Sequence, residues 1–149
     1  MEQDNAILFL ENQLCFPLYA ASRLTIQQYT PYLNELDLTY PQYLVFLALW
    51  EHNELNVNAL GEKLHLASNT LTPLLKRMEE KGWLSRKRAT NDERVVNVTL
   101  TNKGQTLKYE ALKIPLKLLT KLQNPTISEE ELKQFQQTLW KLISILSNQ

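Results

Sequence analysis

Residues 60–104 read LGEKLHLASNTLTPLLKRMEEKGWLSRKRATNDERVVNVTLTNKG, and their pattern of apolar and polar side chains predicts a fold class. The segment begins with a short helix and a tight turn, and a longer helix follows with one buried stripe of Leu71, Leu74, Leu75 and Met78. Gly82 ends that helix in the usual left-handed cap position. WLSRKR and VVNVTL are two extended runs joined by the polar ATNDER, which is typical of a β-hairpin. Helix, turn, helix and hairpin together predict a winged helix-turn-helix over residues 55–103.

The N-terminal third favours helices. The apolar spacing predicts a helix over residues 5–29, kinked at Pro17 because proline has no amide hydrogen for the preceding turn. A short second helix is expected over 31–36. Thr39 and Gln42 form a capping box, so the apolar run YLVFLALW is predicted to be a buried helix and not a strand.

Capping residues mark the later helices too. Asn56 and Ser68 are expected to cap the two helices of the helix-turn-helix. Thr101 begins a long helix that reaches about residue 121, and a capping box at Ser128 begins the last one. The fold class is therefore mainly α (α+β), with one small hairpin.

The chain has 149 residues and a mass of 17.4 kDa, which predicts one domain. The terminal helices carry more apolar surface than the winged unit can cover. This favours a helical dimerisation region made of residues 1–37 and 104–149, and hence a homodimer. A single monomeric core would account for the pattern nearly as well.

The net charge is zero, but the charges are unevenly distributed. Residues 1–62 carry −7, residues 63–103 carry +5 and residues 104–149 carry +2. A positive winged unit fits a polyanion partner such as nucleic acid, although chance clustering of surface Lys and Arg fits equally well. The acidic N-terminus and the short apolar runs predict a cytoplasmic protein with no signal peptide and no membrane partner.

The predicted DNA-contacting surface combines the second helix with the wing. Opposite its apolar stripe this helix presents Asn69, Thr70, Thr72, Pro73, Lys76 and Arg77. Ser68 reads more readily as a cap than as a base contact. The hairpin adds Arg86, Lys87, Arg88, Asp92, Glu93 and Arg94. An arginine at a wing tip suits the negative potential of a narrow minor groove, whereas Asp92 is expected to orient Arg94 or another arginine. A solvated hairpin of mixed charge is the alternative.

Residues 60–104 resemble the winged core of the MarR family of transcription regulators, with DERVVNVTLTNKG as the signature part. ENQLCFPLYAASR (11–23) and LTYPQYLVFLALWEH (38–52) extend the resemblance to the one-cysteine branch that senses organic hydroperoxides. The resemblance spans roughly residues 8–146. Where that branch commonly has Asp-Ser-Gly, this chain has Ala67-Ser68-Asn69, and Pro17 replaces an aliphatic residue.

The resemblance implies an obligate homodimer that represses transcription by placing two winged units on a palindromic operator. Carried onto this chain, the family's DNA contacts fall on Ser68, Thr70, Thr72, Lys76, Arg77, Asp92 and Arg94. It also implies that the Cys15 thiolate is held by the hydroxyls of Tyr29 and Tyr40, with Tyr19 as a further member. An organic hydroperoxide would then oxidise Cys15 and release the DNA, and a small cellular thiol would react with the oxidised sulfur.

Other interpretations stay open at this point. From the residues alone, a lone cysteine on an apolar helix face is most often a small buried hydrophobe. A MarR-type regulator of wider stress or virulence programmes, relieved by a small phenolic ligand, would leave Cys15 inert. A thiol peroxidase is disfavoured because the chain has no second cysteine. No cofactor is expected, and no metal site either, since His52 and His65 stand apart from any grouped ligands.

Overall fold

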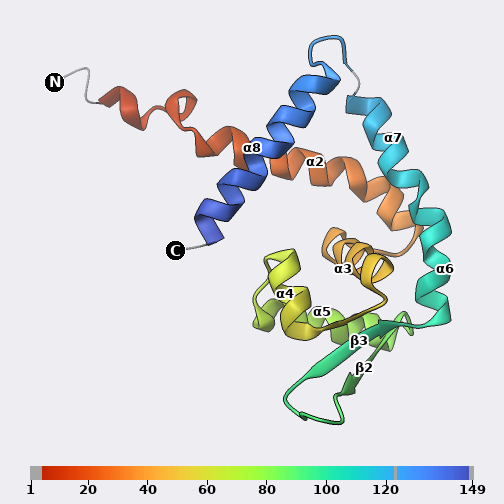
Figure 1. The fold of residues 1–149 in the computed structure, drawn as a ribbon. Coiled ribbons are helices and arrows are strands. Elements are labelled where there is room, and N and C mark those ends of the chain that lie inside the picture. The colour runs from red at the N-terminus through yellow and green to blue at the C-terminus, as the bar shows by residue number, and fades with distance from the viewer. Residues whose placement is uncertain (1–4, 123, 148–149) are drawn as a thin grey trace. The chain divides into compact units, whose positions relative to one another are not determined.

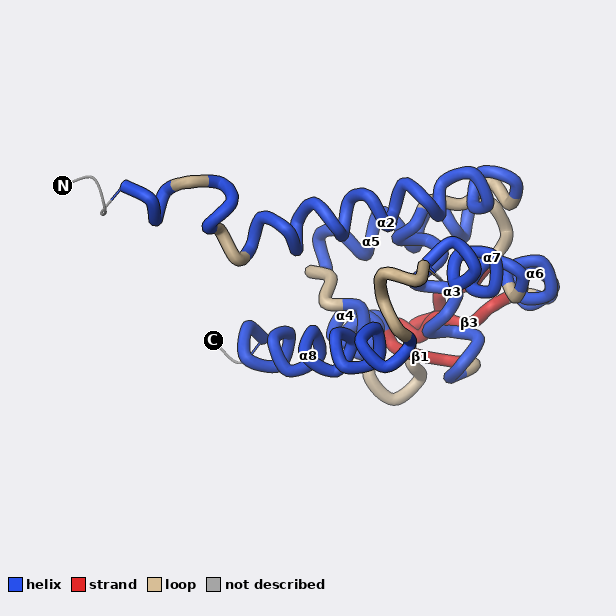
Figure 2. The backbone as a smooth tube through the Cα atoms, turned by 90° about the horizontal axis from the view of Figure 1, so that it is seen from above, coloured by secondary structure: helices blue, strands red, loops and turns tan. Residues whose placement is uncertain are grey.

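The structure, a computed structural model, describes residues 5–122 and 124–147. It divides into two compact units, Met1–Ile114 and Pro115–Gln149, and each is described by itself. Figures 1 and 2 show the succession of helices and the one small sheet. The elements are the 3-10 turns η1 (Ala6–Leu8) and η2 (Leu10–Asn12), the helices α2 (Cys15–Glu35), α3 (Tyr40–His52), α4 (Val57–Leu64), α5 (Ser68–Glu80), α6 (Asn102–Ala111), α7 (Lys113–Leu122) and α8 (Glu129–Ser147), and the strands β1 (Glu54–Asn56), β2 (Leu84–Arg88) and β3 (Val96–Leu100).

Helix α3 is the centre of the first unit. Its Val45, Phe46 and Leu49 side chains are fully buried, and it packs against α4, α5, α6 and the sheet. The Phe46 ring stacks on Trp50 at 5.0 Å and meets the edge of Trp83 at 5.7 Å. The winged unit therefore rests on a continuous apolar core, which fixes α5 and the hairpin relative to each other.

The sheet is antiparallel, with β3 between β1 and β2. Val98 at its centre is buried and pairs with Leu55 on one side and Arg86 on the other. Figure 1 shows the β2–β3 hairpin extending beyond α4 and α5. The predicted winged helix-turn-helix is thus confirmed, and β1 joins the hairpin as a third strand.

Most of the predicted start and stop signals are present. Thr39 and Gln42 form the capping box of α3, and the Asn56 side chain accepts a hydrogen bond from the amide of Ala59. Gly82 has a φ of 73°, a left-handed conformation that costs little only for glycine. The remaining confirmed caps are Thr101 on α6 and the reciprocal pair of Ser128 and Glu131 on α8.

The predicted N-terminal helix over 5–29 is wrong in its start and its end. Residues 6–12 form two short 3-10 turns, and the α-helix begins only at Cys15. Pro17 therefore lies in the first turn, where its missing amide hydrogen costs nothing, so it does not act as a mid-helix kink. The separate helix over 31–36 is also wrong, because α2 continues through Pro31 to Glu35.

Two further predictions need correction. Ser68 is not the cap of α5: Ala67 holds that position, without a side-chain hydrogen bond, and Ser68 is the first helical residue. The long helix that starts after Thr101 is broken into α6 and α7 around Leu112. Pro115 explains the break, since it has no amide hydrogen to donate to the carbonyl of Ala111.

Large apolar side chains remain exposed near both ends of the chain. In the first unit they include Ile7, Leu8, Phe9, Leu10 and Leu14. In the second unit they include Phe135, Trp140, Ile145 and Leu146 on α8. Among the described residues, no helix combines the length and the apolar character that crossing a membrane requires.

Candidate nucleic-acid interface and thiol site

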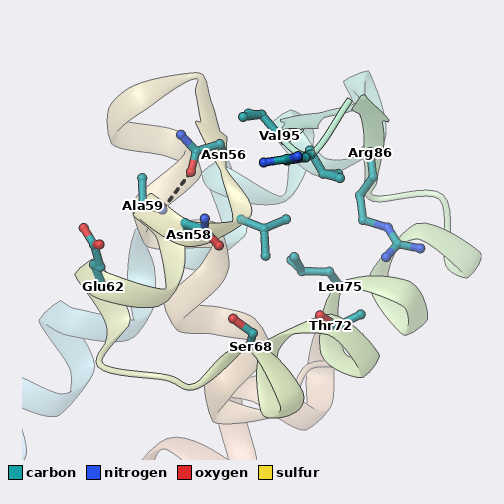
Figure 3. Close-up of a pocket in the computed structure, with 12 residues that line it drawn as sticks. Asn56, Asn58, Ala59, Glu62, Ser68, Thr72, Leu75, Arg86 and Val95 are labelled. Atoms are coloured by element: carbon teal, nitrogen blue, oxygen red, sulfur yellow. Dashed lines mark hydrogen bonds between the residues drawn. The ribbon is translucent and has the colours of Figure 1, made fainter. Parts of the chain in front are cut away.

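A hollow of about 470 Å³ lies between α4, α5 and the wing. Figure 3 shows Asn58 and Glu62 of α4, Ser68 and Thr72 of α5, and Arg86 of β2 around it. Arg94 and Val95 complete its rim from the hairpin. Polar and apolar side chains both line the hollow, and the polar ones offer hydrogen-bond donors and acceptors to a polar ligand.

Helix α5 has the two-sided character of a recognition helix. Its four predicted stripe residues, Leu71, Leu74, Leu75 and Met78, are all buried. All seven predicted contact residues are exposed on the opposite side: Ser68, Asn69, Thr70, Thr72, Pro73, Lys76 and Arg77. The Lys76 ammonium lies 4.0 Å from the Glu80 carboxylate, and both side chains are exposed. Such a pair is weak, so the ammonium stays available to a phosphate.

The wing tip is ordered by local hydrogen bonds. Asp92 accepts a hydrogen bond from the backbone amide of Arg94 at 3.0 Å, and Arg88 donates to the carbonyl of Glu93 at 3.0 Å. Asp92 thus orients Arg94 through the backbone, without an ion pair to its guanidinium. Among the described residues no acid pairs with the exposed Arg94 side chain, so its charge is free to meet a phosphate or a groove.

Arg86, predicted as a DNA contact, is held by another residue. Its Nε and Nη2 donate to Glu79 Oε2 at 3.0 and 2.8 Å, and its backbone amide donates to Glu79 Oε1 at 2.8 Å. These hydrogen bonds lower the pKa of the Glu79 carboxyl from its ordinary value of 4.5. The pair joins the base of the wing to the end of α5, so Arg86 helps to fix the angle between these two elements.

Replacing Glu79 by Gln is expected to lower the free energy of unfolding by about 1 kcal/mol at neutral pH, a modest value because the pair is partly exposed. Because the folded-state pKa is depressed, the stabilisation is present above the unfolded value of 4.5 and is lost as the pH falls through the folded one. Urea unfolding at decreasing pH measures this, with the exposed Glu80→Gln as control. A difference between Glu79→Gln and wild type that does not shrink toward acid would contradict the assignment.

Cys15 is exposed and is the first residue of α2. The alternative of a buried, purely apolar role for this lone cysteine is therefore not seen within one chain. Tyr19 lies one turn further along the same face, and the Arg23 guanidinium lies 5.5 Å from the Tyr19 ring centroid. Sequence reasoning placed Cys15 in mid-helix and so missed this helix terminus.

Three tyrosines form a cluster where α2 passes the start of α3. The Tyr29 and Tyr40 ring centroids are 4.9 Å apart, and Tyr43 lies 5.9 Å from the first and 6.3 Å from the second. Burial raises the pKa of Tyr29 and Tyr40, and it raises the pKa of Tyr43 to about 12. All three hydroxyls therefore keep their protons at neutral pH and can donate hydrogen bonds. The predicted pair of Tyr29 and Tyr40 is brought together, and Tyr43 was missed.

The same chain does not bring Cys15 to this cluster. Cys15 and Tyr29 stand fourteen positions apart on one continuous helix. At about 1.5 Å of rise per residue, their backbones are separated by about 21 Å along the axis. A contact between the thiol and these phenols therefore requires a second copy of the chain.

Across residues 5–122 and 124–147, no three His, Cys, Asp or Glu side chains are grouped closely enough to hold a metal ion.

The known proteins that this chain resembles are described as transcriptional regulators. A family model described as transcriptional regulator SarA/Rot matches residues 27–111. The organic hydroperoxide resistance transcriptional regulator of Bacillus subtilis (strain 168) is 50% identical over 137 residues, which is 92% of this chain and 91% of the relative. The regulator SarZ of Staphylococcus aureus (strain USA300) is 42% identical over 123 residues, 83% of this chain and 81% of that protein.

Solved structures show the same fold. Reduced AbfR bound to DNA superposes with a TM-score of 0.74 and 38% identity, over 98% of this chain and 99% of that one. AbfR is a protein of Staphylococcus epidermidis, and its overoxidized form has also been solved bound to DNA. These relatives are transcriptional regulators and not enzymes. The chain therefore belongs to the MarR-type family of winged-helix transcriptional regulators, in the branch of the organic hydroperoxide resistance regulators.

Proposed function

We propose that the protein is a cytoplasmic repressor that binds a palindromic operator as a homodimer and releases it when an organic hydroperoxide oxidises Cys15. The observation that carries the proposal is the single exposed thiol at the start of α2. The chain is 50% identical over 137 residues to an organic hydroperoxide resistance regulator. The winged surface supplies the DNA-binding half of the function. The thiol supplies the sensing half.

The DNA-binding half follows from the hollow between α5 and the wing. Helix α5 has the dimensions and the polar outer face of a helix that enters a major groove, where hydroxyl and amide groups meet base edges. Lys76, Arg77 and Arg94 neutralise phosphates, and Arg94 additionally suits the minor groove. Arg86 positions the wing and does not need to touch DNA itself.

The homodimer explains the exposed apolar side chains near both termini. Contiguous exposed apolar surface on a soluble protein marks an interaction site, and here residues 5–14 and α8 each carry such surface. A second copy of the chain would cover it. The same dimer would place Tyr29 and Tyr40 of one protomer within reach of the partner's thiol, which one chain cannot do.

The chemistry then has two steps. The thiolate of Cys15 attacks the outer oxygen of the hydroperoxide, which yields a sulfenate and an alcohol and oxidises the sulfur by two electrons. A small cellular thiol then attacks the sulfenic acid and forms a mixed disulfide, with release of water. A disulfide within one chain is impossible because Cys15 has no second cysteine to join.

We place DNA release at the mixed disulfide. Reduced and overoxidized AbfR have both been solved on DNA, so added oxygen atoms alone did not prevent a complex in that relative. A thiol adduct adds much more bulk at the subunit contact. Lys81 connects α2 to the recognition helix and can transmit a shift of α2 to it. Its ammonium binds the Asp37 carboxylate at 2.6 Å and so joins the end of α5 to the α2–α3 corner.

The test is operator binding followed by fluorescence anisotropy, using DNA from upstream of the protein's own gene. We expect binding by the reduced protein, at least tenfold weaker binding after cumene hydroperoxide and cysteine, and recovery with dithiothreitol, since about 1.4 kcal/mol of coupling gives a factor of ten. An operator affinity that is unchanged by the oxidant would refute the proposed sensing role of Cys15. A salicylate-like phenol that releases DNA from thiol-blocked protein would favour ligand control instead.

A further inference from the structure

Tyr43 is the most enclosed member of the tyrosine cluster, with only 2% of its surface exposed. It stands three residues after Tyr40 on α3, so both side chains leave the same face of the helix. Its ring is in contact distance of both Tyr29 and Tyr40, at centroid separations of 5.9 and 6.3 Å. The family resemblance assigned no role to this residue.

The Tyr43 hydroxyl has no hydrogen-bond partner among the described residues. The wholly enclosed side-chain polar atoms of the described part all have partners, so this hydroxyl lies at the accessible edge of its otherwise buried ring. Phenylalanine would fill the same core volume, so the packing of the ring does not require the hydroxyl. The hydroxyl is therefore unexplained by the packing of one chain.

The phenols of Tyr29 and Tyr40 are the candidate acceptors, because both rings lie next to the Tyr43 ring. The three hydroxyls interact electrostatically, because a negative charge on Tyr29 or Tyr40 would raise the pKa of Tyr43. Burial keeps Tyr43 protonated, as its pKa of about 12 indicates. A proton donor thus lies beside two phenols that are only half-buried and can adjust their orientation.

We propose that Tyr43 is a positioning residue of the thiol site: its hydroxyl donates to the phenolic oxygen of Tyr29 or Tyr40 when that phenol donates its own proton to the thiolate of the partner's Cys15. The proposal rests on the proposed function. A phenol that donates to an anion becomes a stronger acceptor, so a second hydrogen bond behind it strengthens the first. The cluster then acts as a two-layer donor network in place of two separate phenols.

The test compares Tyr43→Phe with Tyr109→Phe, a control that removes the hydroxyl of an exposed tyrosine on α6. Stopped-flow oxidation by cumene hydroperoxide and alkylation by iodoacetamide are measured as a function of pH. We expect Tyr43→Phe to react about two- to tenfold more slowly near neutral pH, as loss of one hydrogen bond allows, with the difference closing in alkali where the thiol ionises unaided. Operator affinity of the reduced variant is expected to match wild type.

Wild-type rates for Tyr43→Phe at every pH would overturn the proposal, and so would a loss of rate that is the same at every pH, since that indicates a steric effect. Failure of the proposed function is distinguishable. In that case the wild-type protein itself would not release DNA on oxidation, whereas failure of the Tyr43 proposal leaves that response intact.

Discussion

Cys15→Ser is expected to bind the operator with wild-type affinity, within about twofold, and to show no loss of binding after treatment with cumene hydroperoxide and cysteine. The wild-type protein under the same treatment is expected to lose at least about tenfold in affinity. Serine replaces sulfur by oxygen at an exposed position, so neither the core nor the winged surface is disturbed. Its hydroxyl cannot follow the oxidation ladder of a thiol.

Anisotropy titrations of both proteins, before and after oxidant, measure this. Oxidation of Met78, the methionine of the described core, is a competing reaction that has to be monitored. Mass spectrometry of both proteins separates the two reactions. A Cys15→Ser protein that still releases DNA on oxidation would show that another group senses the peroxide.

Arg94→Ala is expected to weaken operator binding by more than about tenfold at moderate salt while leaving the dimer intact. The guanidinium is exposed at the wing tip, has no acidic partner among the described residues and lines the hollow with Ser68 and Thr72. Its removal deletes an interaction with DNA and nothing from the core. The dependence of log affinity on log salt should become shallower by about one for each phosphate that the variant no longer neutralises.

The matched control is Lys108→Ala, which deletes one positive charge from the exposed face of α6, away from the hollow. Affinities at several salt concentrations, together with the molar mass from light scattering, compare the two variants. If Arg94→Ala binds like wild type, or no worse than Lys108→Ala, the wing does not touch DNA as proposed.

Local signals explain which parts of the fold were predictable. Capping side chains such as Thr39, Asn56 and Thr101 bond within three residues, so the sequence displays both partners together. The stripe of α5 was likewise readable from its period. The start of α2 was not, because apolar residues continue upstream of Cys15 at helical spacing while the chain forms 3-10 turns there.

In the candidate site, too, the features set by local sequence were predictable and those set by long-range packing were not. The exposed face of α5 and the tip of the wing followed from pattern alone. The pairing of Arg86 with Glu79 did not, because it joins two elements whose separation only the folded core defines. The grouping of Tyr29 with Tyr40 came from family resemblance, and Tyr43 became visible only when the ring distances were known.

The most direct measurement of the central claim follows sulfur chemistry and DNA release in one sample. Operator-bound protein is titrated with cumene hydroperoxide in the presence of cysteine, the anisotropy is read at each step, and bound and free protein are separated for intact-mass analysis. The account predicts that the free fraction carries the cysteine adduct on Cys15 and that the bound fraction carries reduced sulfur. Adducted protein that remains on the DNA, or released protein with an unmodified Cys15, would contradict it.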